Sequence, residues 1–212
     1  AGVLPGNPFA MLALKTEKIP AANQLVRDRF IWIYYGVVGL QCSIMAMLGP
    51  IMPFLKSELS MSYQLAGFHF SAFALGSVVA GLSCDSLFHR LGQQKTIYMS
   101  GVGTIVGLMA LIMGQHPAIT ILGILIAGFT TSVTYQTLAT VVSNHLKELR
   151  TFAFVEAESM AMFGALIGPF AVSLAVATKL GWRAALIILA LAFVAVLPML
   201  KTFGKTRTVE TK

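Results

Sequence analysis

Six long stretches of the sequence carry almost no charged residue, and they constrain the fold more than any other feature. They cover residues 30–54, 61–84, 96–114, 117–144, 151–178 and 184–200. A helix that crosses the hydrocarbon core of a bilayer needs about 20 predominantly apolar residues, and each stretch has or approaches that length. Only 11% of the chain is charged and 57% is hydrophobic, whereas soluble domains average about 25% charged residues. The chain is therefore predicted to be an integral multi-pass membrane protein.

The spans are predicted to be helices because a backbone in hydrocarbon must satisfy its hydrogen bonds within the segment. Strands of a membrane barrel would instead alternate polar and apolar residues. We predict an all-α membrane protein with six transmembrane helices. Its expected organisation is an N-terminal tail at 1–29, a six-helix transmembrane bundle at 30–200 and a basic C-terminal tail at 201–212.

Lysine and arginine are distributed unevenly over the predicted connections. If both termini are cytoplasmic, twelve of the fifteen basic residues lie on that side, and only Lys56, Lys179 and Arg183 fall in the other loops. Cytoplasmic loops carry an excess of Lys and Arg, so both termini are predicted to be cytoplasmic. The net charge of +7 is then explained by topology and by attraction to anionic lipid. No nucleic-acid partner is predicted.

Several short motifs follow one another along these spans. They are residues 49–56 (GPIMPFLK), 81–95 (GLSCDSLFHRLGQQK), 164–169 (GALIGP) and 181–183 (GWR). In this order and spacing they resemble the major facilitator superfamily over about residues 30–200. The resemblance implies a secondary transporter whose six helices form a 3+3 inverted repeat, as in one half of such a carrier. Its substrate would be a small molecule that the sequence does not identify.

The resemblance also assigns roles to individual residues. Asp85, Arg90 and Lys95 stand where the family has a gating loop between its second and third helices. The match is incomplete there, because Ser86 replaces a basic residue, four residues are inserted before Arg90, and two glutamines stand where paired arginines are expected. Three residues of the fifth helix form a candidate hinge, since their small side chains allow close packing and a proline bends a helix. They are Gly164, Gly168 and Pro169.

The family's usual twelve helices leave a second half to be supplied. Membrane lipid is one expected partner, and the other is a second six-helix half, a homodimer mate or a larger membrane complex. We therefore expect a half-carrier that transports by alternating access. The alternative is a non-transporting accessory or assembly subunit of a larger integral membrane complex.

Polar side chains recur at helical spacing in the first and fourth spans, where they fit the wall of a substrate cavity. The candidates are Tyr34, Gln41, Ser132, Gln136 and Thr140. Met45 extends the first stripe, and Thr130, Thr134 and Thr137 form a neighbouring one. The alternative is structural, because Ser and Thr often bond to their own helix and a buried Gln often joins two helices.

Three ionisable residues fall inside the spans. His69 is a cavity candidate or a neutral hydrogen-bonding group between helices. Glu156 and Glu158 are candidates for coupling transport to a proton, because ionisable groups at membrane depth are costly. The alternative is an interfacial role, in which Glu156 pairs with Arg150 or Lys147.

Catalytic and cofactor signals are missing from the sequence. We find no metal-ligand spacing, no phosphate-binding loop and no nucleophile with a matching base. Cys42 and Cys84 are predicted to be packing residues. We expect no enzyme activity, no cofactor and no metal.

Overall fold

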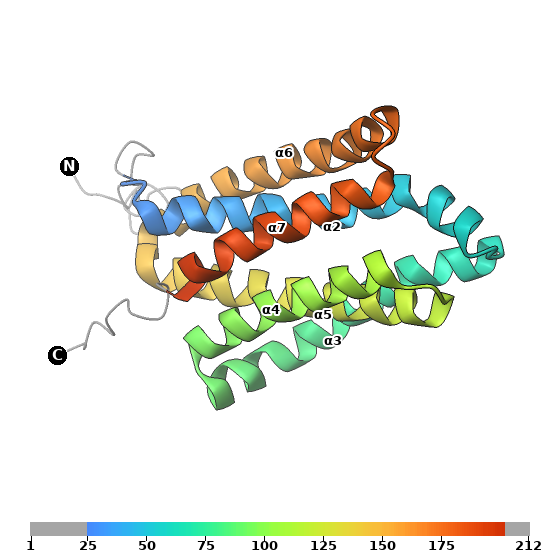
Figure 1. The fold of residues 1–212 in the computed structure, drawn as a ribbon. Helices are drawn as coiled ribbons and strands as arrows, with labels where there is room; N and C mark the ends of the chain where they lie inside the picture. The colour runs from blue at the N-terminus through green and yellow to red at the C-terminus, as the bar shows by residue number, and fades with distance from the viewer. Residues whose placement is uncertain (1–24, 202–212) are drawn as a thin grey trace, which may run out of the picture.

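The computed structural model describes residues 25–201, and its regular elements are helices (Figure 1). In chain order they are α2 (Arg29–Glu58), α3 (Tyr63–Leu91), α4 (Gln93–Met113), α5 (Pro117–Leu146), the short 3-10 helix η2 (Lys147–Leu149), α6 (Arg150–Ala177) and α7 (Trp182–Leu200). The predicted all-α class is confirmed for these residues. Most of the predicted tails at 1–29 and 201–212 lies outside the described residues.

Five helical segments of the described chain are long and apolar enough to cross a membrane, against the six that the sequence predicts. The difference arises because α5, η2 and α6 follow one another directly and form one segment of 61 residues, Pro117–Ala177. A straight helix of that length would extend about 90 Å, three times the ~30 Å hydrocarbon core. The chain instead reverses at η2, where Lys147 has a positive φ of 45° (Figure 1). The 3+3 repeat stays a prediction.

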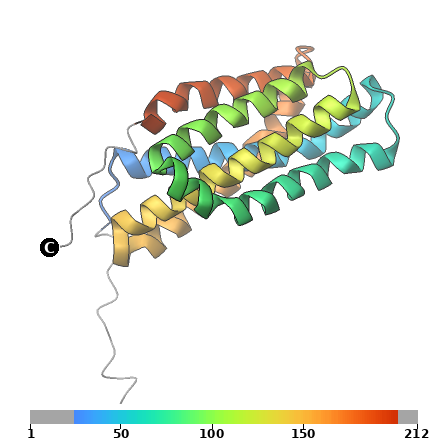
Figure 2. The ribbon, with the colours of Figure 1, turned by 90° about the horizontal axis from the view of Figure 1, so that it is seen from below.

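The helices form two groups, with α2, α6 and α7 in one and α3, α4 and α5 in the other (Figure 1). Within them, α6 packs mainly on α2, while α3 and α4 both pack on α5. Figure 2 shows α7, α4, α5 and α3 side by side in that order, so contacts between α4 and α7 join the two groups. Two of these three close pairs, α2 with α6 and α3 with α5, are not consecutive in the chain.

Small residues allow the closest of these helix contacts. A Cβ atom at Gly168 of α6 would lie 2.8 Å from the backbone oxygen of Ser43 in α2, and one at Gly164 would overlap the carbonyl of Gly39. The contact between α4 and α5 is similar, since a Cβ at Gly107 would lie 2.7 Å from the oxygen of Gly123. Each backbone therefore fills the space that a side chain would need.

The connection between α3 and α4 is shorter than predicted. α3 continues to Leu91, past the expected end at 84, and Gly92 alone separates it from α4. Gly92 has a φ of 77°, a conformation that glycine adopts readily. The gating candidates Asp85 and Arg90 therefore lie on a helix and not on a loop, because the 29 residues of α3 extend about 44 Å at 1.5 Å per residue and pass beyond the apolar stretch.

Candidate functional site

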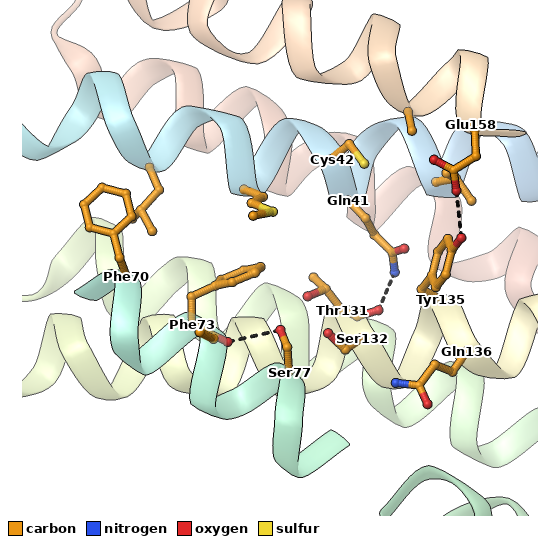
Figure 3. A pocket seen from close by; sticks show the side chains of 15 residues that line it. Gln41, Cys42, Phe70, Phe73, Ser77, Thr131, Ser132, Tyr135, Gln136 and Glu158 are labelled. Carbon is orange, nitrogen blue, oxygen red and sulfur yellow. Dashed lines mark hydrogen bonds between the residues drawn. The ribbon is translucent and has the colours of Figure 1, made fainter. Parts of the chain in front are cut away.

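An open cleft of about 770 Å³ lies between α2, α3, α5 and α6 (Figure 3). Two helices of each group contribute to it, so it lies where the groups face one another. Its lining residues are Val38, Gln41, Cys42, Met45, Leu48, Phe70, Phe73, Ala74, Ser77, Thr131, Ser132, Tyr135, Gln136, Glu158 and Ala161. The volume is typical of sites that bind small molecules.

One end of the cleft is polar. Tyr135 of α5 donates a hydrogen bond from its hydroxyl to Oε1 of Glu158 in α6, at 2.9 Å. Gln136 and Ser132, which follow the same face of α5, also line the cleft (Figure 3). Glu158 is exposed in the structure, and it is the one acidic residue among the lining side chains. An acid, an amide and two hydroxyls are therefore available to a molecule at this end.

Gln41 of α2 lies in the cleft with its two amide atoms in different situations. Its Nε2 donates a hydrogen bond to the backbone oxygen of Thr131 in α5 at 2.8 Å, which fixes the orientation of the amide because a carbonyl can only accept. Its Oε1 has no hydrogen-bond partner, although the side chain is only 7% exposed. The residue therefore joins two helices and also keeps an unused acceptor.

The other end of the cleft is apolar and aromatic. Phe70 and Phe73 enter it from α3 (Figure 3), and Met45 and Leu48 of α2 also line the cleft. Ser77, one turn beyond Phe73, donates its hydroxyl to the backbone oxygen of Phe73 at 3.1 Å. The same hydroxyl lies 3.4 Å from the backbone oxygen of Gly128 in α5, so its hydrogen is taken by backbone carbonyls.

Three predicted cavity residues lie elsewhere. Tyr34 is fully buried in the core, where its ring contacts that of Phe154 with centroids 6.4 Å apart. Thr140 is exposed and donates its hydroxyl to the carbonyl of Gln136 at 2.9 Å, as the structural alternative predicts. Neither residue lines the cleft, because the polar stripe is longer than the part of each helix that faces it.

His69 is the third, and it is completely buried between α3 and α5. Its Nδ1 bonds to the carbonyl of Leu65 at 3.2 Å and therefore carries the hydrogen, since a carbonyl only accepts. Its Nε2 then accepts from the hydroxyl of Thr120 at 2.9 Å. This is the geometry of a hydrogen-bonding group between helices, which was the alternative to a cavity role.

In the neighbouring threonine stripe of α5, Thr130 and Thr134 face α4, whereas the Thr137 hydroxyl lies 3.6 Å from the sulfur of Cys84 in α3. Thr134 donates its hydroxyl to Ser100 at 2.7 Å, and the hydroxyls of Thr130 and Thr104 lie 3.0 Å apart. These side chains are buried. The two polar stripes of α5 thus separate into one that joins two helices and one that reaches the cleft.

Glu156 is engaged at the end of the bundle where α2 begins. Arg27 donates from Nε to Glu156 Oε2 at 3.0 Å, and the Tyr35 hydroxyl donates to the same oxygen at 2.7 Å. The hydrogen bond to Glu156 raises the pKa of Arg27. The predicted partners Arg150 and Lys147 were wrong, because α2 lies along α6 and brings Arg27 to the carboxylate.

The gating and hinge candidates lie away from the cleft. Asp85 pairs with His89 on its own helix, with 3.3 Å between Oδ1 and Nε2, and Arg90 and Lys95 are exposed. Pro169 lies within the continuous helix α6. The hinge glycines contact α2, where the Ser43 hydroxyl donates to the carbonyl of Gly164 at 2.9 Å. Among residues 25–201 no three His, Cys, Asp or Glu side chains gather at one point.

Sequence reasoning missed Tyr135 and the two phenylalanines of the cleft, Phe70 and Phe73. Tyr135 and Glu158 are 23 residues apart on different helices, so no spacing within one helix reveals the pair. The phenylalanines resemble any lipid-facing aromatic residue in the sequence. Gln41, Ser132, Gln136 and Glu158 were among the predicted candidates, and the structure places all four around the cleft.

Comparison with known proteins adds the family. No curated protein matches the chain at a significant level. A sequence profile described as Major Facilitator Superfamily matches residues 27–212, which include every helix that the structure describes and every residue of the cleft. The resemblance seen in the motifs is thereby confirmed, and the chain belongs to the major facilitator superfamily.

Proposed function

We propose that this chain moves a small solute across a membrane by alternating access, with the cleft as part of the substrate path. Members of this superfamily are generally transporters and not enzymes, so membership indicates secondary transport. The observation that carries the proposal is Glu158. It lies eight residues into α6, about 12 Å along the helix axis, and it faces a cleft instead of a protein cation. Ionisable groups in spans are costly, and they mark substrate and ion paths.

The cleft needs a second wall. Glu158 is exposed in this chain, and an exposed carboxylate at membrane depth would face hydrocarbon at considerable cost. Exposed apolar side chains run along α3 and α6, two of the helices that line the cleft. They include Leu75, Val78, Val79, Leu82, Met162, Phe163, Leu166, Ile167 and Phe170. A second six-helix unit, from a homodimer mate or another half, would close the cleft and leave it accessible to water from one side at a time.

The movement is proposed to occur between helix groups and not within them. The contact of α2 with α6 is tightly packed at Gly39 and Gly164, so that pair is expected to move as one body. Pro169 removes one backbone hydrogen bond from α6, and because Gly168 beside it packs on the backbone of Ser43 in α2, any bend at this candidate hinge is expected to carry α2 with α6. Protonation of Glu158 is the proposed coupling event, because a neutral carboxyl is less costly in a closed site.

The test is uptake by the protein reconstituted in vesicles, with a panel of labelled amines, sugars, amino acids and carboxylates. We expect Gln136→Ala to reduce uptake of the accepted solute several-fold without changing the yield of folded protein. The matched control is Gln115→Ala, an exposed glutamine near the start of α5 and outside the cleft. Folded protein that takes up nothing, and that is recovered with unrelated membrane proteins in fixed ratio, would instead favour an accessory subunit.

The proposed orientation has both termini in the cytoplasm. It places Arg27 and Glu156 at the cytoplasmic end of the bundle and Arg183, which donates to Glu58 at 2.6 Å, at the other. Single cysteines introduced at Lys95 and Lys179 would be labelled by an impermeant reagent from opposite sides. Labelling of Lys95→Cys from outside intact cells would reverse the orientation.

A further inference from the structure

We infer that the cleft selects amphipathic organic cations, with an N–H group of the ligand bound between Glu158 and Gln41 and an apolar body over the aromatic end. The inference rests on the proposed transport function, since it names a substrate class for the same cleft. The charge of the lining carries the first step. Glu158 is acidic, and no lysine, arginine or histidine is among the lining residues.

The hydrogen-bonding groups at the polar end favour a ligand that donates. Tyr135 donates to Oε1 of Glu158, and no described residue donates a hydrogen bond to Oε2. Gln41 Oε1 is a second acceptor without a partner, while the donor atom of the same amide is engaged by Thr131. A protonated amine supplies several N–H donors and a positive charge in one group, and it therefore satisfies both acceptors.

The unpaired amide oxygen is the sharper of these two observations. A buried polar group without a hydrogen bond destabilises a protein, and Gln41 is only 7% exposed. The amide cannot relieve this by rotating, because its nitrogen would then lose the bond to Thr131. A donor carried by a ligand would satisfy the oxygen without breaking that bond.

The rest of the cleft fits an apolar body. Phe70 and Phe73 present aromatic rings (Figure 3), and the lining also includes the apolar side chains of Met45, Leu48 and Val38. Aromatic faces also attract cations, so they remain compatible with a charged ligand. A carboxylate or phosphate would meet the Glu158 charge with no cation to offset it. A sugar would leave most of its hydroxyls against apolar side chains.

The experiment uses three naphthyl probes of similar size, namely naphthylethylammonium, naphthylethanol and naphthylacetate. The full chain, with whatever copurifies, is placed in nanodiscs of zwitterionic phosphatidylcholine, and binding is measured by equilibrium dialysis against empty nanodiscs. We expect the ammonium probe to bind at least about tenfold more tightly than the alcohol, which is ~1.4 kcal/mol, and the acetate to bind most weakly. Equal binding of the three, tighter binding of the acetate, or no binding of the ammonium probe would overturn the inference.

Variants locate the effect. Glu158→Gln should remove the preference for the ammonium probe and leave the affinity for the alcohol unchanged. Glu158→Asp should keep part of that preference. Gln41→Leu should weaken binding of the ammonium probe more than binding of the alcohol. Glu156→Gln, which changes an acid two residues away that does not line the cleft, should retain the full preference. A preference that survives Glu158→Gln would place the cation elsewhere and contradict the inference.

The result is separable from the fate of the proposed function. Charge-dependent binding with no uptake of any solute in vesicles would support this ligand class and count against transport. Uptake of a neutral or anionic solute, with no binding of the ammonium probe, would support transport and overturn the ligand class.

Discussion

Glu156 and Glu158 lie two residues apart on α6, yet they belong to two different regions of the molecule. Two residues correspond to about 200° around a helix, so the carboxylates face different sides. Glu156 meets Arg27 and Tyr35 where α2 begins, whereas Glu158 meets a single hydroxyl and an open cleft. An acid in a membrane helix therefore does not by itself mark a transport site. The distinction lies in whether protein groups already satisfy it.

The comparison depends first on the close approach of α2 and α6, and Gly164→Ala is the most severe way to break it. The added Cβ would overlap the carbonyl of Gly39, so the helices must separate, and overpacking of this kind costs about 1–3 kcal/mol or more. We expect a lower thermal unfolding midpoint and less folded protein by size-exclusion chromatography. Gly36→Ala is the control, because a Cβ there meets nothing within 4 Å. Equal loss in both variants would argue against the packing explanation.

The second prediction separates function from stability at Glu158. Glu158→Gln should lower uptake at least about tenfold, while the free energy of unfolding should change by less than about 0.5 kcal/mol, as for exposed positions generally. The reason is that the amide oxygen can still accept from Tyr135. Uptake and thermal unfolding are measured on the same preparation. A variant that unfolds readily but transports normally would reverse the roles assigned to the two acids.

The third prediction concerns Glu156, where substitution is expected to lower stability and to leave uptake nearly unchanged. Glu156→Gln should lower the free energy of unfolding by about 1 kcal/mol or less, since the side chains of Arg27 and Glu156 are 41% and 31% exposed. A cycle with Arg27→Gln isolates the pair, and its coupling should shrink as salt is raised. Uptake should be nearly unchanged. Strong loss of uptake with unchanged stability would show that Glu156 also belongs to the substrate path.

The smallest effect is expected on the face of α5 that meets α4. Thr134→Val removes the 2.7 Å bond to Ser100, and hydrogen bonds between membrane helices average about 0.6 kcal/mol. We expect the free energy of unfolding to fall by about that amount and uptake to stay unchanged. Ser132→Ala, on the cleft face two residues away, should lower uptake and leave the free energy of unfolding unchanged. The pair extends the contrast between the two acids to hydroxyl groups.

Much of this fold follows from composition and spacing. Long uncharged stretches predict the helices, because lipid leaves the backbone no other way to satisfy its hydrogen bonds. The order of the motifs predicted the family. The predicted end of α3 was wrong because a helix can continue past its apolar stretch, as α3 does through Asp85 and Arg90.

The site was predictable only in part. A polar stripe shows that Ser132, Gln136 and Thr140 share a face, and it does not show how far the cleft extends along that face. For His69, the same residue type fits a cavity or a buried bond, and the Thr120 hydroxyl that decides between them comes from another helix. Pairs such as Tyr135 with Glu158 depend on how the helices pack. How the helices pack is determined by small residues on several helices together, and no single stretch of sequence shows it.

The pairing of α2 with α6 has a consequence for biogenesis. α2 begins at Arg29 and its main partner begins at Arg150, so most of the bundle must be synthesised before that interface can form. Until then Gly39 lacks its neighbouring backbone, Gln41 depends on α5 alone, and Arg27 has no Glu156 to pair with. Contacts this distant in sequence form late. Among the described helices, α2 is thus synthesised early but reaches its final packing late, and the cleft that it lines is completed at the same moment.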